Sequence, residues 1–372
     1  MEFGAPAVAS LQCDVGGETS SANRPRQTKG ATMKAIVYSE TGEPSVLREI
    51  DRELDEPGTG EVRVRLAVSG VNPTDWKSRK GAAPGPLDDG DHVPNLDGAG
   101  VIEAIGAGVT GLAVGDRVWT TLAAYQRPLS GTAQQSTVLP GGRVFPLPEV
   151  ADFDLGASLG VPAMTAHRAL TIAEDGPTRL SPGALAGRII LVAGGAGAVG
   201  HAAIQLAKWA GATVITTVSS EAKATLASAA GADHVINYRD TDVAAEVRAI
   251  APDGVDLIVE VAASRNADLD LAVLRVRGTI AIYGNDRGDT FQFDFGRSIG
   301  LNARYQFVLL YTVGQDAVDA AAEDINAAIV AGALPVGDSA GLPIIRFPLA
   351  DTAAAHAAVE ADAVGKVLID IP

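Results

Sequence analysis

A glycine-rich turn in the second half of the chain is the residue pattern with the clearest chemistry. Gly195, Gly197 and Gly200 follow the apolar run 189–193 and precede a helical stretch. In this context Gly195 permits a tight turn, Gly197 lets backbone amides approach a pyrophosphate, and Gly200 lets the helix pack closely on the strand. The alternative, a glycine-rich turn without a ligand, is disfavoured because further βα units follow. The predicted dinucleotide site is formed by Gly195, Gly197, Ala198, Val199 and Gly200.

The next predicted strand, Thr213–Val218, ends in serines where an acidic residue would indicate NAD. In NAD-specific proteins an Asp or Glu at this point usually binds the ribose hydroxyls. Ser219 and Lys223 could instead bind a 2′-phosphate, because a hydroxyl and an ammonium group both donate to phosphate oxygens. We therefore expect NADPH. Two points against this choice stay open: Glu221 lies nearby, and Lys223 could be only a solvated helix residue.

The overall charge and the cysteine content restrict the partner classes. The 372 residues include 45 acidic and 29 basic ones, a formal charge of −16, so we expect neither a nucleic-acid partner nor a membrane partner. The single cysteine, Cys13, cannot form an intrachain disulfide or a Cys-based zinc site, and the reducing cytoplasm suits it best. Residues 1–32 lack the apolar core of a secretory signal and are predicted to be a disordered extension.

The pattern of apolar residues changes at about Asp152. Short alternating strands dominate the chain before this point, whereas helical segments alternate with apolar runs after it, which is typical of βαβ units. The predicted fold class is α/β, a β-rich domain plus a Rossmann doubly wound parallel sheet. The predicted strands are 34–38, 61–68, 100–105, 117–121, 189–193, 213–218, 234–237, 256–261, 279–283, 303–311, 344–347 and 367–371.

Several segments together resemble one enzyme family over residues 33–372. They are 70–73 (GVNP), 94–101 (PNLDGAGV), 115–118 (GDRV), 162–166 (PAMTA), the glycine turn 195–200 and 365–367 (GKV). The chain resembles the zinc-free medium-chain dehydrogenases/reductases of the quinone oxidoreductase (zeta-crystallin-like) and enone reductase branch. The resemblance implies a GroES-like catalytic domain at 33–155, completed by 335–372, a Rossmann NADP-binding domain at 156–334, and an active site in the cleft between them.

The resemblance also bears on zinc. Zinc-dependent relatives carry a cysteine in the segment occupied here by Val71 and Asn72, and a histidine near Leu96 to Gly98, where this chain has none. We therefore expect no catalytic metal. Without a Lewis acid, a hydride can still be delivered to an acceptor polarised by conjugation, such as a quinone or an α,β-unsaturated carbonyl.

Asn72 and Lys77 are the predicted catalytic residues. By resemblance Asn72 lies beside the nicotinamide ribose and the substrate, where its amide could donate to a developing oxyanion; its alternative role is a turn residue before Pro73. Typical quinone oxidoreductases have a tyrosine at the position of Lys77, whereas a lysine could bind ribose hydroxyls or stabilise an enolate. The alternative for Lys77 is a solvated surface lysine.

The remaining predicted cofactor contacts also come from the resemblance. They are Thr165 near the nicotinamide carboxamide, Lys223 and Tyr238 around the adenosine phosphate, Gly284 near the ribose, Phe307 and Leu309 facing the nicotinamide, and Lys366. Tyr238 and Phe307 could equally be core aromatics.

The expected activity is therefore zinc-independent, NADPH-dependent hydride transfer to a quinone or an α,β-unsaturated carbonyl. Two alternatives are a non-catalytic NADPH-binding or sensing protein of crystallin type and an enoyl reductase acting on a tethered acyl thioester. Strand 303–311 at the end of the cofactor domain predicts a homodimer, because an unpaired apolar edge invites pairing with a second copy.

Overall fold

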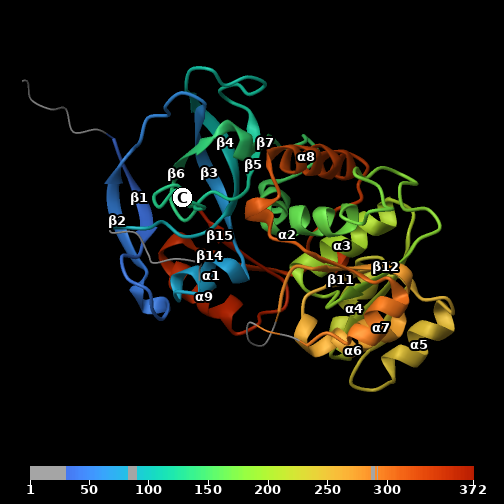
Figure 1. The fold of residues 1–372 in the computed structure, drawn as a ribbon. Coiled ribbons are helices and arrows are strands. Elements are labelled where there is room, and N and C mark those ends of the chain that lie inside the picture. The colour runs from blue at the N-terminus through green and yellow to red at the C-terminus, as the bar shows by residue number, and fades with distance from the viewer. Residues whose placement is uncertain (1–30, 83–89, 286–289, 291) are drawn as a thin grey trace, which may run out of the picture. The chain divides into compact units, whose positions relative to one another are not determined.

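The computed structural model describes residues 31–82, 90–285, 290 and 292–372. Nearly all of the predicted extension 1–32 lies outside these residues. Every described helix and strand belongs to one compact unit, Thr32–Pro372 (Figure 1). The strands are β1 (Thr32–Val37), β2 (Arg48–Glu53), β3 (Glu61–Val71), β4 (Asp97–Ile105), β5 (Arg117–Thr120), β6 (Ser136–Pro140), β7 (Val144–Pro146), β8 (Ile189–Ala193), β9 (Thr213–Val218), β10 (His234–Asn237), β11 (Val255–Glu260), β12 (Leu274–Ile282), β13 (Arg304–Phe307), β14 (Ile344–Pro348) and β15 (Lys366–Asp370). The helices are α1 (Pro73–Arg79), α2 (Phe153–Thr171), α3 (Ala198–Trp209), α4 (Glu221–Ala229), α5 (Val243–Ile250), α6 (Ala263–Val273), α7 (Phe295–Leu301), α8 (Gln315–Val330) and α9 (Thr352–Glu360), with a 3-10 turn, η3, at Leu310–Thr312.

A parallel sheet with the strand order β10-β9-β8-β11-β12-β13 forms the second half of the unit. Successive side chains of a strand point to opposite faces, and both faces are covered here. Ile190 and Val192 pack in a cluster with residues of α2, α3 and α8, whereas Leu191 packs in another with residues of α5 and α6. Burial on both faces explains the uninterrupted apolar run of β8. The strand order reverses between β8 and β11, where ligands bind in such sheets.

A mixed sheet with the order β14-β15-β3-β4-β5-β7, in which β6 also pairs with β3, forms the other half. β15 is antiparallel to β3, with Val367 opposite Val71, so the end of the chain completes a sheet that its beginning started (Figure 1). β1 and β2 form a separate antiparallel pair. The predicted α/β fold class, a β-rich part plus a Rossmann-type sheet, is confirmed.

Helix α2 contacts both halves. It packs against β4 and β5 and also against α3 and α8. It runs across the predicted domain boundary between residues 155 and 156, so the limits 33–155, 156–334 and 335–372 stay predictions. Among the described residues, no helix has both the length and the apolar character needed to cross a membrane.

The predicted strands 189–193, 213–218 and 234–237 coincide with β8, β9 and β10, but strand 303–311 is wrong in its extent. β13 ends at Phe307, because η3 then turns the chain: the N–H and the hydroxyl of Thr312 both donate to the carbonyl of Leu309. The prediction also missed α1. Pro73 is the first residue of this helix, a position at which the backbone N–H has no partner within the helix, so that a proline is tolerated.

Candidate functional site

The predicted glycine turn lies between β8 and α3, next to the reversal of strand order. Gly197 is the N-cap residue of α3, and Gly194 and Gly197 are exposed, whereas Gly195 and Gly200 are buried. The first turn of α3 contains no acidic residue, and no side chain caps it. Its first N–H groups therefore have no acceptor within the helix, and the positive end of the helix dipole is not neutralised by the helix's own residues.

A Cβ atom built on each glycine distinguishes those required by packing from those that keep a surface open. On Gly195 it would lie 2.1 Å from Thr216 Oγ1, and on Gly200 it would lie 2.4 Å from the carbonyl oxygen of Gly194. On Gly197 the only neighbour within 4 Å among the residues that the structure describes would be that same carbonyl oxygen, at 3.4 Å. Gly195 and Gly200 thus let α3 pack on the sheet, while Gly197 leaves an open backbone surface that fits a pyrophosphate.

The residues predicted for the adenosine phosphate gather at the carboxyl ends of β9 and β10. Ser219 follows β9, and Tyr238, which follows β10, donates its N–H to the carbonyl of Val218 at 3.1 Å. Tyr238 is 44% exposed and is therefore not a core aromatic. Lys223 lies half-buried in the first turn of α4. Sequence reasoning missed the exposed Arg239, a second cation beside Tyr238.

The residues predicted for the nicotinamide end lie at the same edge of the parallel sheet, with one exception. Gly284 follows β12, and Phe307 is the last residue of β13. Phe307 and Leu309 are 65% and 50% exposed, whereas Val308 between them is buried. Thr165 comes instead from α2, where it is buried. Contact of these residues with a cofactor stays a prediction.

Asn72 lies at the end of β3 in a buried polar cluster. Its Nδ2 donates to Asp97 Oδ2 at 2.7 Å, and its Oδ1 accepts from Lys366 Nζ at 2.7 Å. Asp97 also accepts from the backbone N–H of Val161, and the backbone N–H of Asn72 donates to Asp75 Oδ2 at 2.7 Å. The side chains of Asp97 and Lys366 are 0% and 1% exposed. Lys366 is therefore placed as a buried partner of Asn72, and direct cofactor contact by Lys366 stays a prediction.

Burial dominates the electrostatics of this cluster. It raises the pKa of Asp97 to about 6, although the charge of Lys366 and the hydrogen bond from Asn72 oppose the change. Burial and the charge of Asp97 raise the pKa of Asp75, and burial lowers the pKa of Lys366. The cluster can thus change its charge near neutral pH.

Tyr311 connects this cluster to the parallel sheet. It lies in η3, shortly after β13, and its hydroxyl hydrogen-bonds the hydroxyl of Thr74 in α1. Its ring also packs against Tyr125, with centroids 4.8 Å apart. Burial raises the pKa of Tyr311, and the charges of Asp75 and Asp97 contribute to the rise. The Asn72 cluster therefore lies near the segment that follows β13.

Lys77 is not part of this cluster. It lies on α1 with an exposed side chain, and its ammonium group is 5.8 Å from the ring centroid of Trp76, where Lys80 lies at 5.9 Å on the same ring. Within the described parts of the chain, Lys77 forms no hydrogen bond or ion pair through its side chain. Its catalytic role stays a prediction, and a solvated cation against Trp76 is the role that its contacts support.

Comparison with known proteins identifies the family. A family model described as an alcohol dehydrogenase GroES-like domain matches residues 58–149, and one described as a zinc-binding dehydrogenase matches residues 198–327. A quinone oxidoreductase of Rattus norvegicus is 34% identical over 260 residues, which are 68% of this chain and 73% of that protein. The chain belongs to the medium-chain dehydrogenase/reductase superfamily. Its relatives indicate the quinone oxidoreductase, zeta-crystallin-like branch.

Two further members of the superfamily match most of the chain. A 2-haloacrylate reductase of Burkholderia sp is 32% identical over 333 residues, 87% of this chain and 94% of its own length. The structure of a mycobacterial protein complexed with NADPH has a TM-score of 0.76 and 31% identity, and the match covers 91% of this chain and 99% of that one. The predicted family is confirmed.

Asn72 and Asp97 lie in the two segments in which the resemblance led us to expect no zinc ligand. Across the described residues, no three His, Cys, Asp or Glu side chains gather as a group that could hold a metal ion. Asp97 and Asp75 were not singled out from the sequence, nor was Tyr311. Asp97 lay in a recognised segment, but only the pairing of β3 with both β4 and β15 brings it to Asn72 and Lys366.

Proposed function

We propose that the protein is an NADPH-dependent oxidoreductase that reduces a quinone or an α,β-unsaturated carbonyl without zinc. The observation that carries the proposal is the open glycine surface at the N-terminus of α3, on the sheet edge that also presents Ser219, Tyr238, Gly284 and Phe307. NADPH-bound mycobacterial and Escherichia coli relatives support the choice of cofactor.

When bound, NADPH supplies the hydride. The backbone N–H groups at Ala198 and Val199 would bind its pyrophosphate, since no residue of the first turn competes for them. Ser219 and Lys223 would bind the 2′-phosphate, and Arg239 offers a further cation. Gly284, Phe307 and Leu309, together with Thr165, would surround the nicotinamide end.

The acceptor is proposed to bind beside Asn72. One N–H of the Asn72 amide is used by Asp97, so one remains for a carbonyl oxygen that becomes negative as hydride arrives at the conjugated carbon. Lys77, in the last turn of α1, is the second proposed catalytic group, acting as a cation for an enolate or a ribose hydroxyl. The relative named 2-haloacrylate reductase supports an activated alkene as one acceptor class.

The test is NADPH oxidation, measured at about 340 nm, with a 1,4-quinone, an alkyl vinyl ketone and an acyl thioester, for the wild type, Asn72→Ala and Lys77→Ala. We expect turnover of the quinone or the enone, and a loss in Asn72→Ala of about 100-fold, the usual cost of removing one oxyanion donor. Binding of NADPH without turnover of any acceptor would favour the sensing alternative. Turnover of the thioester alone would favour the enoyl reductase alternative.

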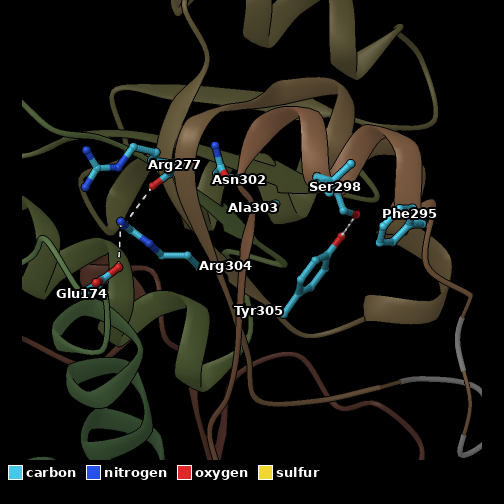
Figure 2. A pocket seen from close by; sticks show the side chains of 9 residues that line it. Glu174, Arg277, Phe295, Ser298, Asn302, Ala303, Arg304 and Tyr305 are labelled. Atoms are coloured by element: carbon cyan, nitrogen blue, oxygen red, sulfur yellow. Dashed lines mark hydrogen bonds and ion pairs between the residues drawn. The ribbon is translucent and has the colours of Figure 1, made fainter.

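We also propose a homodimer formed through β13 and α7. Among the strands of the described region, β13 is at the edge of the parallel sheet, and the neighbouring α7 exposes Phe295 and Ile299 by 75% and 59%. An open groove of about 680 Å³ is lined by residues of α7 and β13. Figure 2 shows its side chains, among which Arg304 pairs with Glu174 and Ser298 hydrogen-bonds Tyr305. An edge strand beside exposed apolar side chains suits pairing with a second copy.

A further inference from the structure

The Asn72 amide has its orientation defined by opposite partners at its two ends. An acceptor, Asp97 Oδ2, contacts Nδ2, and a donor, Lys366 Nζ, contacts Oδ1, each at 2.7 Å. A flipped amide would bring its oxygen against the Asp97 carboxylate and its NH₂ group against the Lys366 ammonium, and both contacts are repulsive. The arrangement leaves the second N–H of Asn72 without an acceptor among the described residues.

Asp97 and Lys366 are themselves held from several sides. The N–H of Val161 donates to both oxygens of Asp97, at 2.9 and 3.0 Å. Lys366 Nζ also donates to the carbonyl of Val71 at 3.3 Å and lies 3.9 Å from Asp97 Oδ2. Both residues are the first of their strands, β4 and β15, which flank β3. The strand pairing therefore sets the position of all three side chains.

Two glycines make the space for these side chains. A Cβ atom on Gly160 would lie 2.1 Å from Asp97 Oδ1, and one on Gly70 would lie 3.2 Å from Nζ of Lys366 and 2.2 Å from the backbone oxygen of Ala157. Stability alone does not account for such an arrangement, because buried ion pairs are often no more stabilising than apolar side chains of the same volume. A role in orienting a reacting group does account for it.

We propose that Asp97 and Lys366 are positioning residues that hold the Asn72 amide so that its second N–H is available to the carbonyl oxygen of the acceptor. The proposal rests on the proposed function for its kinetic consequence, but its structural statement concerns the protein alone. In this role Asp97 and Lys366 act through Asn72, which each of them contacts directly.

The experiment compares Asp97→Asn and Lys366→Met with Asn72→Ala and with the double variants Asp97→Asn/Asn72→Ala and Lys366→Met/Asn72→Ala. The matched control is Asp324→Asn, because Asp324 is likewise a buried carboxylate that accepts from a backbone N–H, that of Leu180, and from a cation, Arg179. We expect Asp97→Asn and Lys366→Met to lower kcat about 10- to 100-fold, because small misplacements of a reacting group cost this much. Each should add no further loss in the Asn72→Ala background, as expected for residues that act as a unit.

A second measurement needs no turnover. The side-chain amide signal of Asn72 in a ¹⁵N–¹H spectrum of the cofactor-free protein is identified by its loss in Asn72→Ala. We expect this signal to shift in Asp97→Asn and in Lys366→Met and to stay in place in Asp324→Asn. An unshifted signal in both variants would overturn the proposal, whatever the activity of the wild type.

Failure of the positioning role and failure of the proposed function are distinguishable. If the wild type reduces no acceptor, the proposed function fails, and the amide signal still decides the positioning role. If the wild type is active but the losses from Asp97→Asn and Asn72→Ala multiply, or Asp324→Asn loses as much kcat as Asp97→Asn, the positioning role is wrong and the proposed function stands.

Discussion

Replacing Gly197 and Gly200 in turn separates cofactor binding from folding. Gly197 has φ −83° and ψ 160°, a conformation open to alanine, and an added Cβ would have one neighbour within 4 Å, at 3.4 Å. Gly197→Ala should therefore fold normally. A Cβ on Gly200 would lie 2.4 Å from the Gly194 carbonyl oxygen and 2.9 Å from the Gly195 Cα, so Gly200→Ala should lose about 1–3 kcal/mol of unfolding free energy through overpacking.

The expected effect on NADPH binding concerns Gly197→Ala. In Gly197→Ala the methyl group occupies the open surface at the helix N-terminus, and loss of one charge-assisted hydrogen bond to phosphate costs about 1.5–3 kcal/mol. At about 1.4 kcal/mol per decade, the Kd for NADPH should rise about ten- to hundredfold.

We would measure the Kd for NADPH by isothermal titration and the Tm by thermal unfolding for Gly197→Ala and Gly200→Ala. Gly141→Ala is the control. Gly141 directly follows β6, and the nearest neighbour of an added Cβ there is the carbonyl oxygen of Gly60 at 3.6 Å, an ordinary contact. A Gly197→Ala protein that keeps both its Tm and its NADPH affinity would refute the placement of the pyrophosphate at this turn.

Three further predictions concern the cofactor, the pH profile and the assembly. Lys223→Ala should raise the Kd for NADPH about tenfold and leave that for NADH unchanged, because only NADPH carries a 2′-phosphate; equal losses for both cofactors would argue against this contact. Burial raises the pKa of Asp97 to about 6, so the charged form of Asp97 is lost as the pH falls through 6. It is this charged form that pairs with Lys366 and accepts a hydrogen bond from Asn72, whose backbone N–H is bound by a second carboxylate, Asp75. We expect kcat/KM to fall below about pH 6 in the wild type and this limb to be absent in Asp97→Asn; a limb that persists unchanged there belongs to another group. Burial raises the pKa of Asp97 above its value in the unfolded chain, so the ionised form of Asp97 lowers the stability of the fold above pH 6. Protonation of Asp97 at lower pH should therefore reduce activity without lowering the Tm. Ile299→Glu should convert the proposed dimer to a monomer in light scattering without lowering the Tm by more than a few degrees, and an already monomeric wild type would contradict the dimer.

Local patterns were sufficient for the strand–turn–helix unit. An apolar run, a glycine spacing and a helical stretch adjacent in sequence predicted β8, the turn and α3, because the atoms that interact there are close along the chain. The end of β13 was not predictable in this way. The apolar residues continue to Leu310, but the 3-10 turn that ends the extended segment is formed where Leu310 enters the core and Tyr311 meets Thr74, far away in sequence.

The surroundings of Asn72 were also outside the reach of local patterns. Resemblance singled out Asn72 and Lys366 separately and assigned both to ligands. Their direct contact depends on pairing between β3 and β15, which are separated by almost 300 residues, and no periodicity encodes such a pairing. Asp97 lay in a recognised segment, but its contact with Asn72 likewise depends on strand pairing, that of β3 with β4.

What the sequence by itself determined is the family, the α/β class and the glycine turn at which a dinucleotide is expected, since these depend on residue types at short spacing. The tertiary structure alone decided which polar groups have partners. It assigned one N–H of Asn72 to Asp97, its oxygen to Lys366, and the ammonium group of Lys77 to the face of Trp76. The physical reason is that burial makes each hydrogen bond necessary, and burial arises only when strands distant in sequence pair in one sheet.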